Sequence, residues 1–292
     1  LGSTITRSRV QAQSSDDAKW KQYSGSKLTF MSENTPPSFA IRDNIKTFTD
    51  LTGIEVEILT DDLPVVQQKV GIDTILHYTC RDRNLLGIQS DLLGAHALGL
   101  RNILAITGDP PKLGDYPDAT AVYDTDSVGL IRIVGEMNRG RDLAGNSIGA
   151  ATSFAVGCGV NPTAEDLDAE LEHFRRKLDA GARFVMTQPV YELAAWERFL
   201  ERLGGSPGVP VLVGILPLQS FRHAEFLHNE VPGIQVPDWV RSRMRDAGNG
   251  GERAGIELAR DLLARCRASA AGVYLMPSFG RYESCLEVLE GS

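Results

Sequence analysis

A regular alternation of short apolar segments with amphipathic segments constrains this chain more than any other feature, and it runs from residue 27 to residue 292. Eight segments are predicted to be strands, each followed by a helical segment. Several of these strands are nearly continuous apolar runs, which is typical of parallel strands covered on both faces. An eight-fold β/α alternation over about 265 residues fits a TIM barrel, whose usual size is about 250 residues. A doubly wound open sheet is the alternative.

The boundaries of the predicted elements follow from the apolar periodicity. We expect strands at 27–32, 56–60, 73–78, 102–107, 147–155, 184–187, 211–215 and 272–276. We expect helices at 38–52, 63–70, 83–98, 127–139, 163–180, 193–203, 220–229, 237–246, 252–269 and 281–289. The helix that begins at residue 163 is predicted to start with a capping box that runs from Thr163 to Asp166.

The first 26 residues differ from the rest of the chain because they are rich in Ser, Gln and charged residues. They contain no apolar run of the kind found in a signal peptide. We therefore expect a disordered leader over residues 1–26 and a single domain over residues 27–292.

Charge and cysteine spacing exclude several classes of function. The chain has 30 Lys and Arg against 38 Asp and Glu, a net charge of −8, which disfavours a nucleic-acid partner. No apolar run reaches the roughly 20 residues that span a bilayer, so no membrane partner is expected. The four cysteines form no CxxC spacing and are expected to be free thiols in a reducing, cytoplasmic compartment.

Polar residues gather where the predicted strands end, which in a barrel is the location of the active site. Glu33 and Asp109 are notable there, because a carboxylate in an apolar mouth can hold a proton for general acid catalysis. Structural explanations are also open: Asp109 before two prolines can shape a turn, and Glu33 can be solvated. The glycine-rich stretches at 156–160 and 248–251 lack both nucleotide-binding glycine spacings, so a nucleotide would have to be held by barrel loops.

Five segments of the chain are recognisable together. They read HYTCRDRN at 77–84, GLRNILAITGDPP at 99–111, KLDAGARFVMTQ at 177–188, GILPL at 214–218 and VYLMP at 273–277. From about residue 71 to residue 292 the chain resembles the methylenetetrahydrofolate reductase family, particularly the version fused to homocysteine methyltransferase. The resemblance implies a TIM-barrel flavoprotein of one-carbon metabolism. Such an enzyme reduces FAD with NAD(P)H and then reduces 5,10-methylenetetrahydrofolate to 5-methyltetrahydrofolate.

Residues 12–70 resemble a different class of protein. The segments KLTFMSENTPP at 27–37 and FTDLTGIEVEI at 48–58 are similar to the start of a periplasmic solute-binding protein. Our hypothesis is a chimera, natural or engineered, with its junction near residues 71–73. A strand-helix-strand-helix piece of another α/β fold would then replace the first two β/α units of the barrel.

The family resemblance also implies roles for individual residues. Glu33 would be the general acid, although the aromatic residues that flank the family's glutamate are absent at 32–37. Asp109 would be the second catalytic residue and would tune hydride release by its charge. The cofactor-binding residues would be Thr60, His77, Thr79, Thr107, Gly108, Asp109, Tyr123, Asp126, Glu170, Arg176 and Lys177. The substrate-binding residues would be Gln188, Gln219 and Phe221.

Some of these residues have simpler explanations. His77 can be a packing histidine, and Glu170, Arg176 and Lys177 can form an exposed charged helix face. Thr107 stands where many family members carry Arg. Two further functions are therefore kept: an inactive barrel scaffold that still binds flavin, and a solute-binding module. The expected partners are a folate substrate and a nicotinamide donor, while the choice of NADH or NADPH and a homo-oligomeric state are left open.

Overall fold

A computed structural model describes two compact units of the chain, Leu1–Thr74 and Ile75–Ser292. The described residues are 24–33, 45–46, 48–50, 52–61, 73–267 and 269–290, and the side chains of 28–33 and 57–61 are not among them. Residues 1–23 of the expected leader and the helix expected at 63–70 therefore lie outside the described residues.

The first unit contains a pair of parallel strands, β1 (Lys27–Glu33) and β2 (Glu55–Asp61). Their register runs from Lys27 opposite Glu55 to Glu33 opposite Asp61. A turn precedes β1, where Gly25 N–H donates to the Gly53 carbonyl at 2.8 Å. Residues 45–46, 48–50 and 52 are helical. The strands predicted at 27–32 and 56–60 are confirmed.

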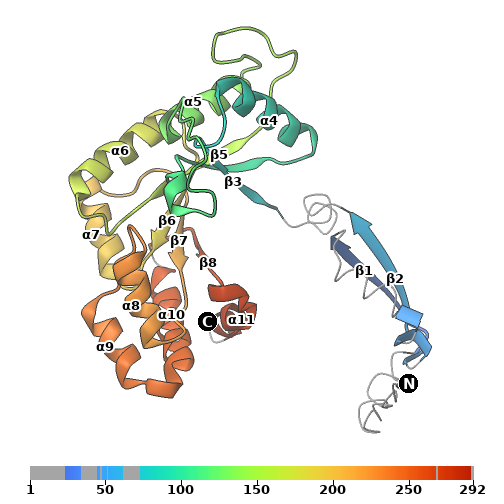
Figure 1. The fold of residues 1–292 in the computed structure, drawn as a ribbon, viewed down its shortest axis with the longest axis vertical. Helices are drawn as coiled ribbons and strands as arrows, with labels where there is room; N and C mark the ends of the chain where they lie inside the picture. The colour runs from blue at the N-terminus through green and yellow to red at the C-terminus, as the bar shows by residue number, and fades with distance from the viewer. Residues whose placement is uncertain are drawn as a thin grey trace, which may run out of the picture. The chain divides into compact units, whose positions relative to one another are not determined.

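The second unit contains a parallel sheet of six strands in sequence order (Figure 1). In a doubly wound sheet the strand order reverses at a switch point. The order here has no reversal from β3 to β8, which is the order found along the wall of a β/α barrel. The strands are β3 (Ile75–Thr79), β4 (Asn102–Ile106), β5 (Ala155–Val160), β6 (Phe184–Pro189), β7 (Val211–Ile215) and β8 (Gly272–Leu275).

Helices connect these strands and cover the sheet. Helix α5 packs against β4 and β5, α6 against β5, and α10 against β7 and β8. The helices are α4 (Leu85–Ala97), α5 (Ser127–Met137), α6 (Leu167–Asp179), α7 (Leu193–Leu203), α8 (Phe221–Glu230), α9 (Asp238–Asp246), α10 (Gly251–Cys266) and α11 (Tyr282–Glu290). Short 3-10 turns lie at Pro111–Leu113 (η1), Gly248–Gly250 (η2) and Ser278–Gly280 (η3).

Aromatic rings fill the space between the sheet and its helices. Trp196 stacks on Phe199 with a centroid distance of 5.7 Å, and Phe174 lies 5.7 Å from Phe199 at a tilt. All three side chains are fully buried. Burial of each contributes about 2–3 kcal/mol to stability. A second cluster, which includes Leu218, Leu227, Val240 and Met244, packs beneath α8, α9 and α10.

The strand predicted at 147–155 is wrong, because β5 covers Ala155–Val160 instead. The sequence of β5, AVGCGV, contains two glycines and was predicted to be an irregular glycine-rich stretch. The reason for the first glycine is a close approach: a Cβ on Gly157 would lie 2.4 Å from the ring of Phe184 on β6. The glycine is therefore a packing residue within a strand.

The predicted start of the helix at residue 163 is also wrong, since α6 begins at Leu167. Asp166 caps the helix by accepting the Ala169 N–H at 2.9 Å. Thr163 instead donates its hydroxyl to Asn161 Oδ1 at 2.9 Å, and its N–H donates to the same oxygen at 3.0 Å. This side-chain turn competes with helix formation and delays it by one turn.

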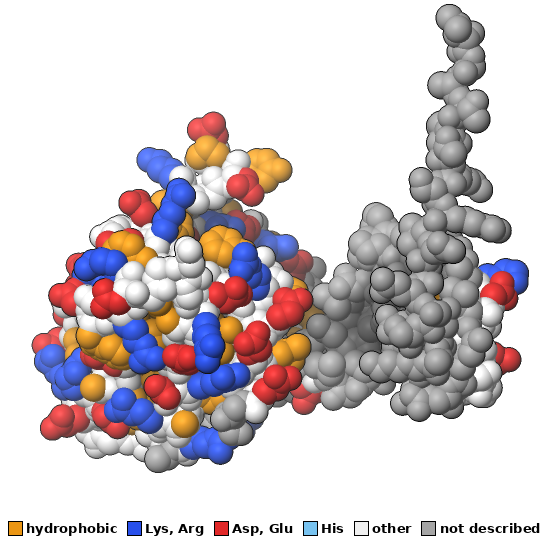
Figure 2. Space-filling view, turned by 90° about the horizontal axis from the view of Figure 1, so that it is seen from below, with side chains coloured by type: hydrophobic (Ala, Val, Ile, Leu, Met, Phe, Trp, Pro, Cys, Tyr) orange, Lys and Arg blue, Asp and Glu red, His pale blue; other side chains and the backbone are white. Residues whose placement is uncertain are grey.

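Charge, thiols and helix lengths complete the description. Acidic and basic side chains are interspersed on the face of the second unit seen in Figure 2. All four cysteines are free thiols: Cys80, Cys158 and Cys266 are buried and Cys285 is partly exposed. No helix among the described residues is long and apolar enough to cross a membrane.

Candidate functional site

The carboxyl ends of β3 to β7 bring together most of the site residues predicted from the sequence. Thr79 ends β3, residues 107–109 follow β4, Gln188 lies near the end of β6, and Gln219 follows β7. Because the strands are parallel and consecutive, these positions share one edge of the sheet. Glu33 and Thr60 lie in the first unit, at the ends of β1 and β2, and their side chains are outside the described residues.

The loops after β3 and β4 cross in close contact. Gly108 has a φ of +91°, and a Cβ there would lie 3.1 Å from Thr79 Cβ. The Tyr123 hydroxyl donates to the Gly108 carbonyl at 3.0 Å, and Tyr123 itself has a φ of +48°. Arg81 Nη1 donates to the Asp109 carbonyl at 3.2 Å. The left-handed backbone at two positions and these contacts fix the loop that carries the exposed Asp109 side chain.

Thr107 and Asp126 join the same loop to the start of α5. Asp126 caps α5 by accepting the Gly129 N–H at 2.8 Å. The Thr107 hydroxyl accepts the Ser127 N–H at 3.2 Å. The second carboxylate oxygen of Asp126 lies 3.8 Å from Arg176 on α6, which is longer than a hydrogen bond. Asp126 therefore brings an acidic side chain and the Arg176 guanidinium to one place.

Helix α6 places its three predicted site residues differently from one another. Lys177 is only 7% exposed, and its Nζ donates to the Gly159 carbonyl of β5 at 2.8 Å. Glu170 accepts the Asn161 N–H at 2.9 Å. Arg176 is exposed. Burial, with a contribution from Lys177, lowers the pKa of the neighbouring His173. Lys177 thus holds α6 on β5, while Arg176 is the cation available to an external anion.

Gln188 is exposed between two buried neighbours, Thr187 and Pro189. The cause is an irregularity in the β6–β7 register between Met186 and Pro189. The Thr187 hydroxyl accepts the Gly214 N–H at 2.9 Å, and the Tyr274 hydroxyl of β8 donates to the Thr187 carbonyl. Burial raises the pKa of Tyr274 to about 12, so the hydroxyl stays protonated and can keep donating.

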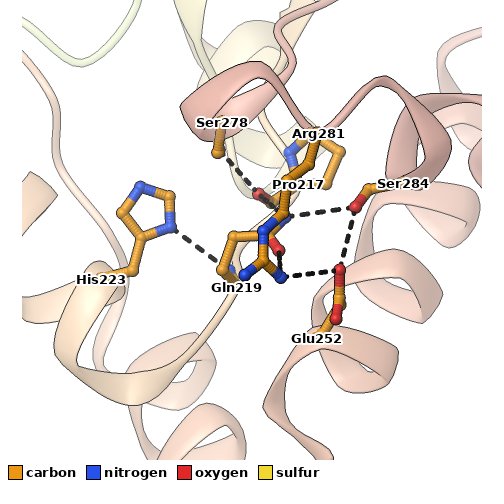
Figure 3. Close-up of polar contacts among 7 residues, drawn as sticks. All are labelled: Pro217, Gln219, His223, Glu252, Ser278, Arg281 and Ser284. Carbon is orange, nitrogen blue, oxygen red and sulfur yellow. Dashed lines mark hydrogen bonds and ion pairs between the residues drawn. The ribbon is translucent and has the colours of Figure 1, made fainter. Parts of the chain in front are cut away.

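Gln219 belongs to a polar cluster between the loops after β7 and β8 (Figure 3). Gln219 Nε2 donates to Ser284 Oγ at 3.4 Å, and Arg281 Nη1 donates to Gln219 Oε1 at 3.4 Å. Arg281 Nη1 and Ser284 Oγ both donate to Glu252 Oε1 at 3.2 Å. Ser278 Oγ donates to the Pro217 carbonyl at 3.2 Å. These contacts tie the two loops to the starts of α10 and α11.

Two further residues flank this polar cluster. The Phe221 ring lies 4.6 Å below the Arg245 guanidinium, so one of its faces is already covered. His223 Nδ1 accepts the Gln219 N–H at 3.2 Å, and burial lowers the His223 pKa. His77, by contrast, is exposed on β3.

Sequence reasoning missed several residues of this edge: Thr187, His223, Glu252, Tyr274, Ser278, Arg281 and Ser284. Thr187 and Tyr274 lie within the recognisable segments at 177–188 and 273–277, which was an available signal. The polar cluster had no signal, because serine, arginine and glutamate are common in surface loops and only the fold brings them together.

The chemistry of the edge is that of a site for an anionic ligand with hydroxyl groups. Arg176 offers a planar set of N–H donors suited to a phosphate. The carboxylates of Asp126 and Glu170 can accept hydrogen bonds from sugar hydroxyls. Among the described residues, no group of three or more His, Cys, Asp or Glu is placed to hold a metal ion.

Two comparisons of sequence identify relatives of this chain. A Schizosaccharomyces pombe protein named methylenetetrahydrofolate reductase 1 is 26% identical over 281 residues, which are 86% of this chain and 43% of that protein. A Pectobacterium carotovorum protein named 5,10-methylenetetrahydrofolate reductase is 25% identical over 205 residues, which are 69% of this chain and 63% of that protein. The chain thus spans about half the length of these relatives.

A solved structure shares the fold. It is an uncharacterized protein from Clostridium thermocellum described as binding two copies of 5-methyl-5,6,7,8-tetrahydrofolic acid. The TM-score is 0.53 at 13% sequence identity, with 93% of this chain and 96% of that chain covered. The family profile of methylenetetrahydrofolate reductase matches residues 44–291, which is most of the sequence. This chain therefore belongs to the methylenetetrahydrofolate reductase family.

Proposed function

We propose that the chain is a flavin-dependent reductase that converts 5,10-methylenetetrahydrofolate to 5-methyltetrahydrofolate with NAD(P)H as the electron donor. The observation that best supports this proposal is the shared sheet edge. Residues that the family resemblance assigns to cofactor and substrate lie there at the ends of β3, β4, β6 and β7 and on α6.

The residues present fit FAD as the cofactor. Arg176 is an exposed cation for a diphosphate, and Asp126, 3.8 Å away, is an acceptor for a ribose hydroxyl. Thr79, Gly108 and Tyr123 form the fixed loop crossing beside them. When bound, FAD would supply a two-electron carrier between the nicotinamide donor and the folate.

The remaining steps rest on side chains of this chain. The Asp109 carboxylate is exposed beyond β4, where its charge would disfavour added negative charge beside it. The exposed Gln188 amide can both donate to and accept from a pterin ring. Glu33, at the carboxyl end of β1, would supply the proton that opens the folate's five-membered ring.

A substitution of Glu33 tests its role as the general acid. Glu33→Gln keeps the shape of the side chain but cannot donate a carboxylic proton. General acid catalysis contributes about 10²- to 10⁴-fold, so we expect folate reduction to fall by that factor. The matched control is Glu55→Gln, at the start of β2, away from the carboxyl ends. Equal folate reduction in Glu33→Gln and in the parent would show that Glu33 is a bystander.

The finer fold and the origin of the chain are part of the proposal. We propose that β1 and β2 supply the first two strands of one barrel over residues 27–292. The family match begins at residue 44, so a segment of foreign origin would be shorter than the 12–70 of the chimera hypothesis. The cytoplasmic location and the fused methyltransferase are likewise drawn from the family resemblance.

Titration of the purified chain with FAD tests the proposed function. We expect a yellow protein that is bleached by NADH or NADPH without oxygen and recoloured by methylenetetrahydrofolate. A colourless protein that takes up no FAD would contradict the proposal. Bound FAD without folate reduction would favour the inactive scaffold, and stabilisation by a small solute with no effect of FAD would favour a solute-binding module.

A further inference from the structure

Phe279 has an unusual position at the carboxyl end of β8. It lies in the turn η3 with φ 54° and ψ 31°, the left-handed region that bulky side chains rarely adopt. Its side chain is nevertheless 79% exposed. The unfavourable backbone is therefore not compensated by burial of the ring, which is a pattern associated with functional positions.

The surrounding contacts hold the turn in this conformation. On one side, the Ser278 hydroxyl donates to the Pro217 carbonyl at 3.2 Å, which ties η3 to the loop after β7. On the other side, Arg281 donates to Glu252 at 3.2 Å, which ties the end of the turn to α10. Phe279 is thus fixed from both neighbours, while its own side chain projects outward.

The Phe279 ring has one aromatic neighbour among the described residues, the ring of His223, at a centroid distance of 5.1 Å. His223 is itself buried and fixed, because its Nδ1 accepts the Gln219 N–H. Its Nε2 therefore carries the proton of the neutral ring. The histidine supports one side of Phe279 and leaves most of the phenyl ring open.

Hydrogen-bonding groups adjoin this aromatic pair. Gln219 and Arg281 lie beside His223 in the cluster of Figure 3, and they contact each other at 3.4 Å. Gln219 also contacts Ser284 at 3.4 Å. Hydrogen bonds of this length are near the outer limit, so an incoming ligand can replace them at small cost. An open aromatic face beside amide and guanidinium groups suits a flat ring that carries nitrogen and oxygen at its edge.

Phe221, assigned to ring stacking from the sequence, is less suited to this role. Its ring is partly buried, and Arg245 lies 4.6 Å from its centroid. Phe279 has the greater free surface.

We infer that Phe279, supported by His223, is a stacking residue for a flat nitrogen-containing aromatic ring of a substrate, either the pterin or the nicotinamide. This inference rests on the proposed function and names a further binding residue for it. Gln219 and Arg281 would contact the edge of the same ring.

The variant Phe279→Gly separates stacking from structure. Glycine adopts a positive φ readily, so the variant should keep or raise the melting temperature. Loss of the ring should raise KM for NAD(P)H or for methylenetetrahydrofolate by about 5- to 20-fold. The dissociation constant of the same molecule, measured by calorimetry on the FAD-loaded protein with NAD(P)⁺ or tetrahydrofolate, should rise equally. The substrate whose constants change identifies the ring.

Two controls complete the experiment. Phe279→Tyr retains the ring and should stay within about 2-fold of the parent. Phe226→Leu removes a 52% exposed ring from α8 and should change neither constant. Normal turnover with unchanged KM and dissociation constants in Phe279→Gly would overturn the inference and leave the proposed function standing. Ligand binding that depends on Phe279 in a protein that reduces no folate would do the reverse. A lower melting temperature with unchanged binding would make Phe279 a packing residue and overturn the inference.

Discussion

Single polar atoms at the carboxyl edge of the sheet mostly contact backbone groups. Lys177 donates to the Gly159 carbonyl, and His223 Nδ1 accepts the Gln219 N–H. In both cases a titratable side chain is used to fix a loop or a helix. Their contribution to stability therefore depends on their protonation state.

His223 should make folding stability depend on pH. Burial lowers its pKa in the folded state below the ordinary value near 6.5, so the folded protein favours the neutral ring. The contribution is fully present above about pH 6.5 and is lost as the pH falls through the folded-state value, because the unfolded chain then binds the extra proton. The loss should be about 1 kcal/mol or more, since the Gln219 N–H also loses its acceptor.

Denaturant unfolding at several pH values between about pH 7 and pH 5 measures this effect. His223→Gln retains an acceptor without a titrating group, so its unfolding free energy should fall less over that range. An identical fall in the variant and the parent would contradict the assignment to His223.

At this scale the sequence indicated which side chains carry chemistry but not what each one contacts. Lys177 and Arg176 are adjacent and equally cationic in the sequence. Only the packing of α6 on β5 buries the first and leaves the second exposed. Residues 219 and 284 meet because two loops converge, and no local pattern encodes that meeting.

Secondary structure elements in this chain begin where a cap or a close packing contact determines it. Asp126 and Asp166 each cap a helix through a carboxylate that accepts a backbone N–H, at 2.8 Å and 2.9 Å. Only Asp126 lies near Arg176. The two aspartates thus form a natural pair in which the capping role is shared and the site role is not.

Substitution of these caps should separate stability from cofactor affinity. Asp126→Ala and Asp166→Ala should each lower the unfolding free energy by about 1 kcal/mol. Only Asp126→Ala should weaken FAD binding, by several-fold, in a titration followed by flavin fluorescence. Equal FAD affinity in the two variants would remove Asp126 from the cofactor site.

Glycine placement in β5 leads to a second expectation at the scale of elements. Gly157→Ala puts a methyl group against the Phe184 ring and should destabilise the protein by about 1–3 kcal/mol. Gly159→Ala is the matched control, because a Cβ there meets only the Met186 carbonyl at 4.0 Å. Thermal unfolding of both variants measures the difference, and equal melting temperatures would contradict a tight contact at Gly157.

Most elements could be predicted because their apolar periodicity is local. The strand at 211–215 and the helix at 193–203 match their predicted bounds. The element that failed, β5, is the one in which a neighbouring strand requires glycine. Local propensity opposes a strand there, and a tertiary contact on β6 overrides it.

For the whole molecule, the proposed single barrel predicts one cooperative unfolding transition that FAD shifts upward. Ligand at about 100 times its dissociation constant should stabilise the native state by about 2.7 kcal/mol. Calorimetry with and without FAD measures this shift. Two separate transitions, only one of which responds to FAD, would contradict a single domain over residues 27–292.

The distribution of the four thiols has a practical consequence for studies of this protein. Burial raises the pKa of Cys80 to about 11, that of Cys158 to about 12 and that of Cys266 to about 11, so these sulfurs remain protonated and shielded near neutral pH. Cys285, on α11, is the partly exposed one. A maleimide dye or spin label would attach there first, giving a reporter close to the end of the chain without prior mutagenesis.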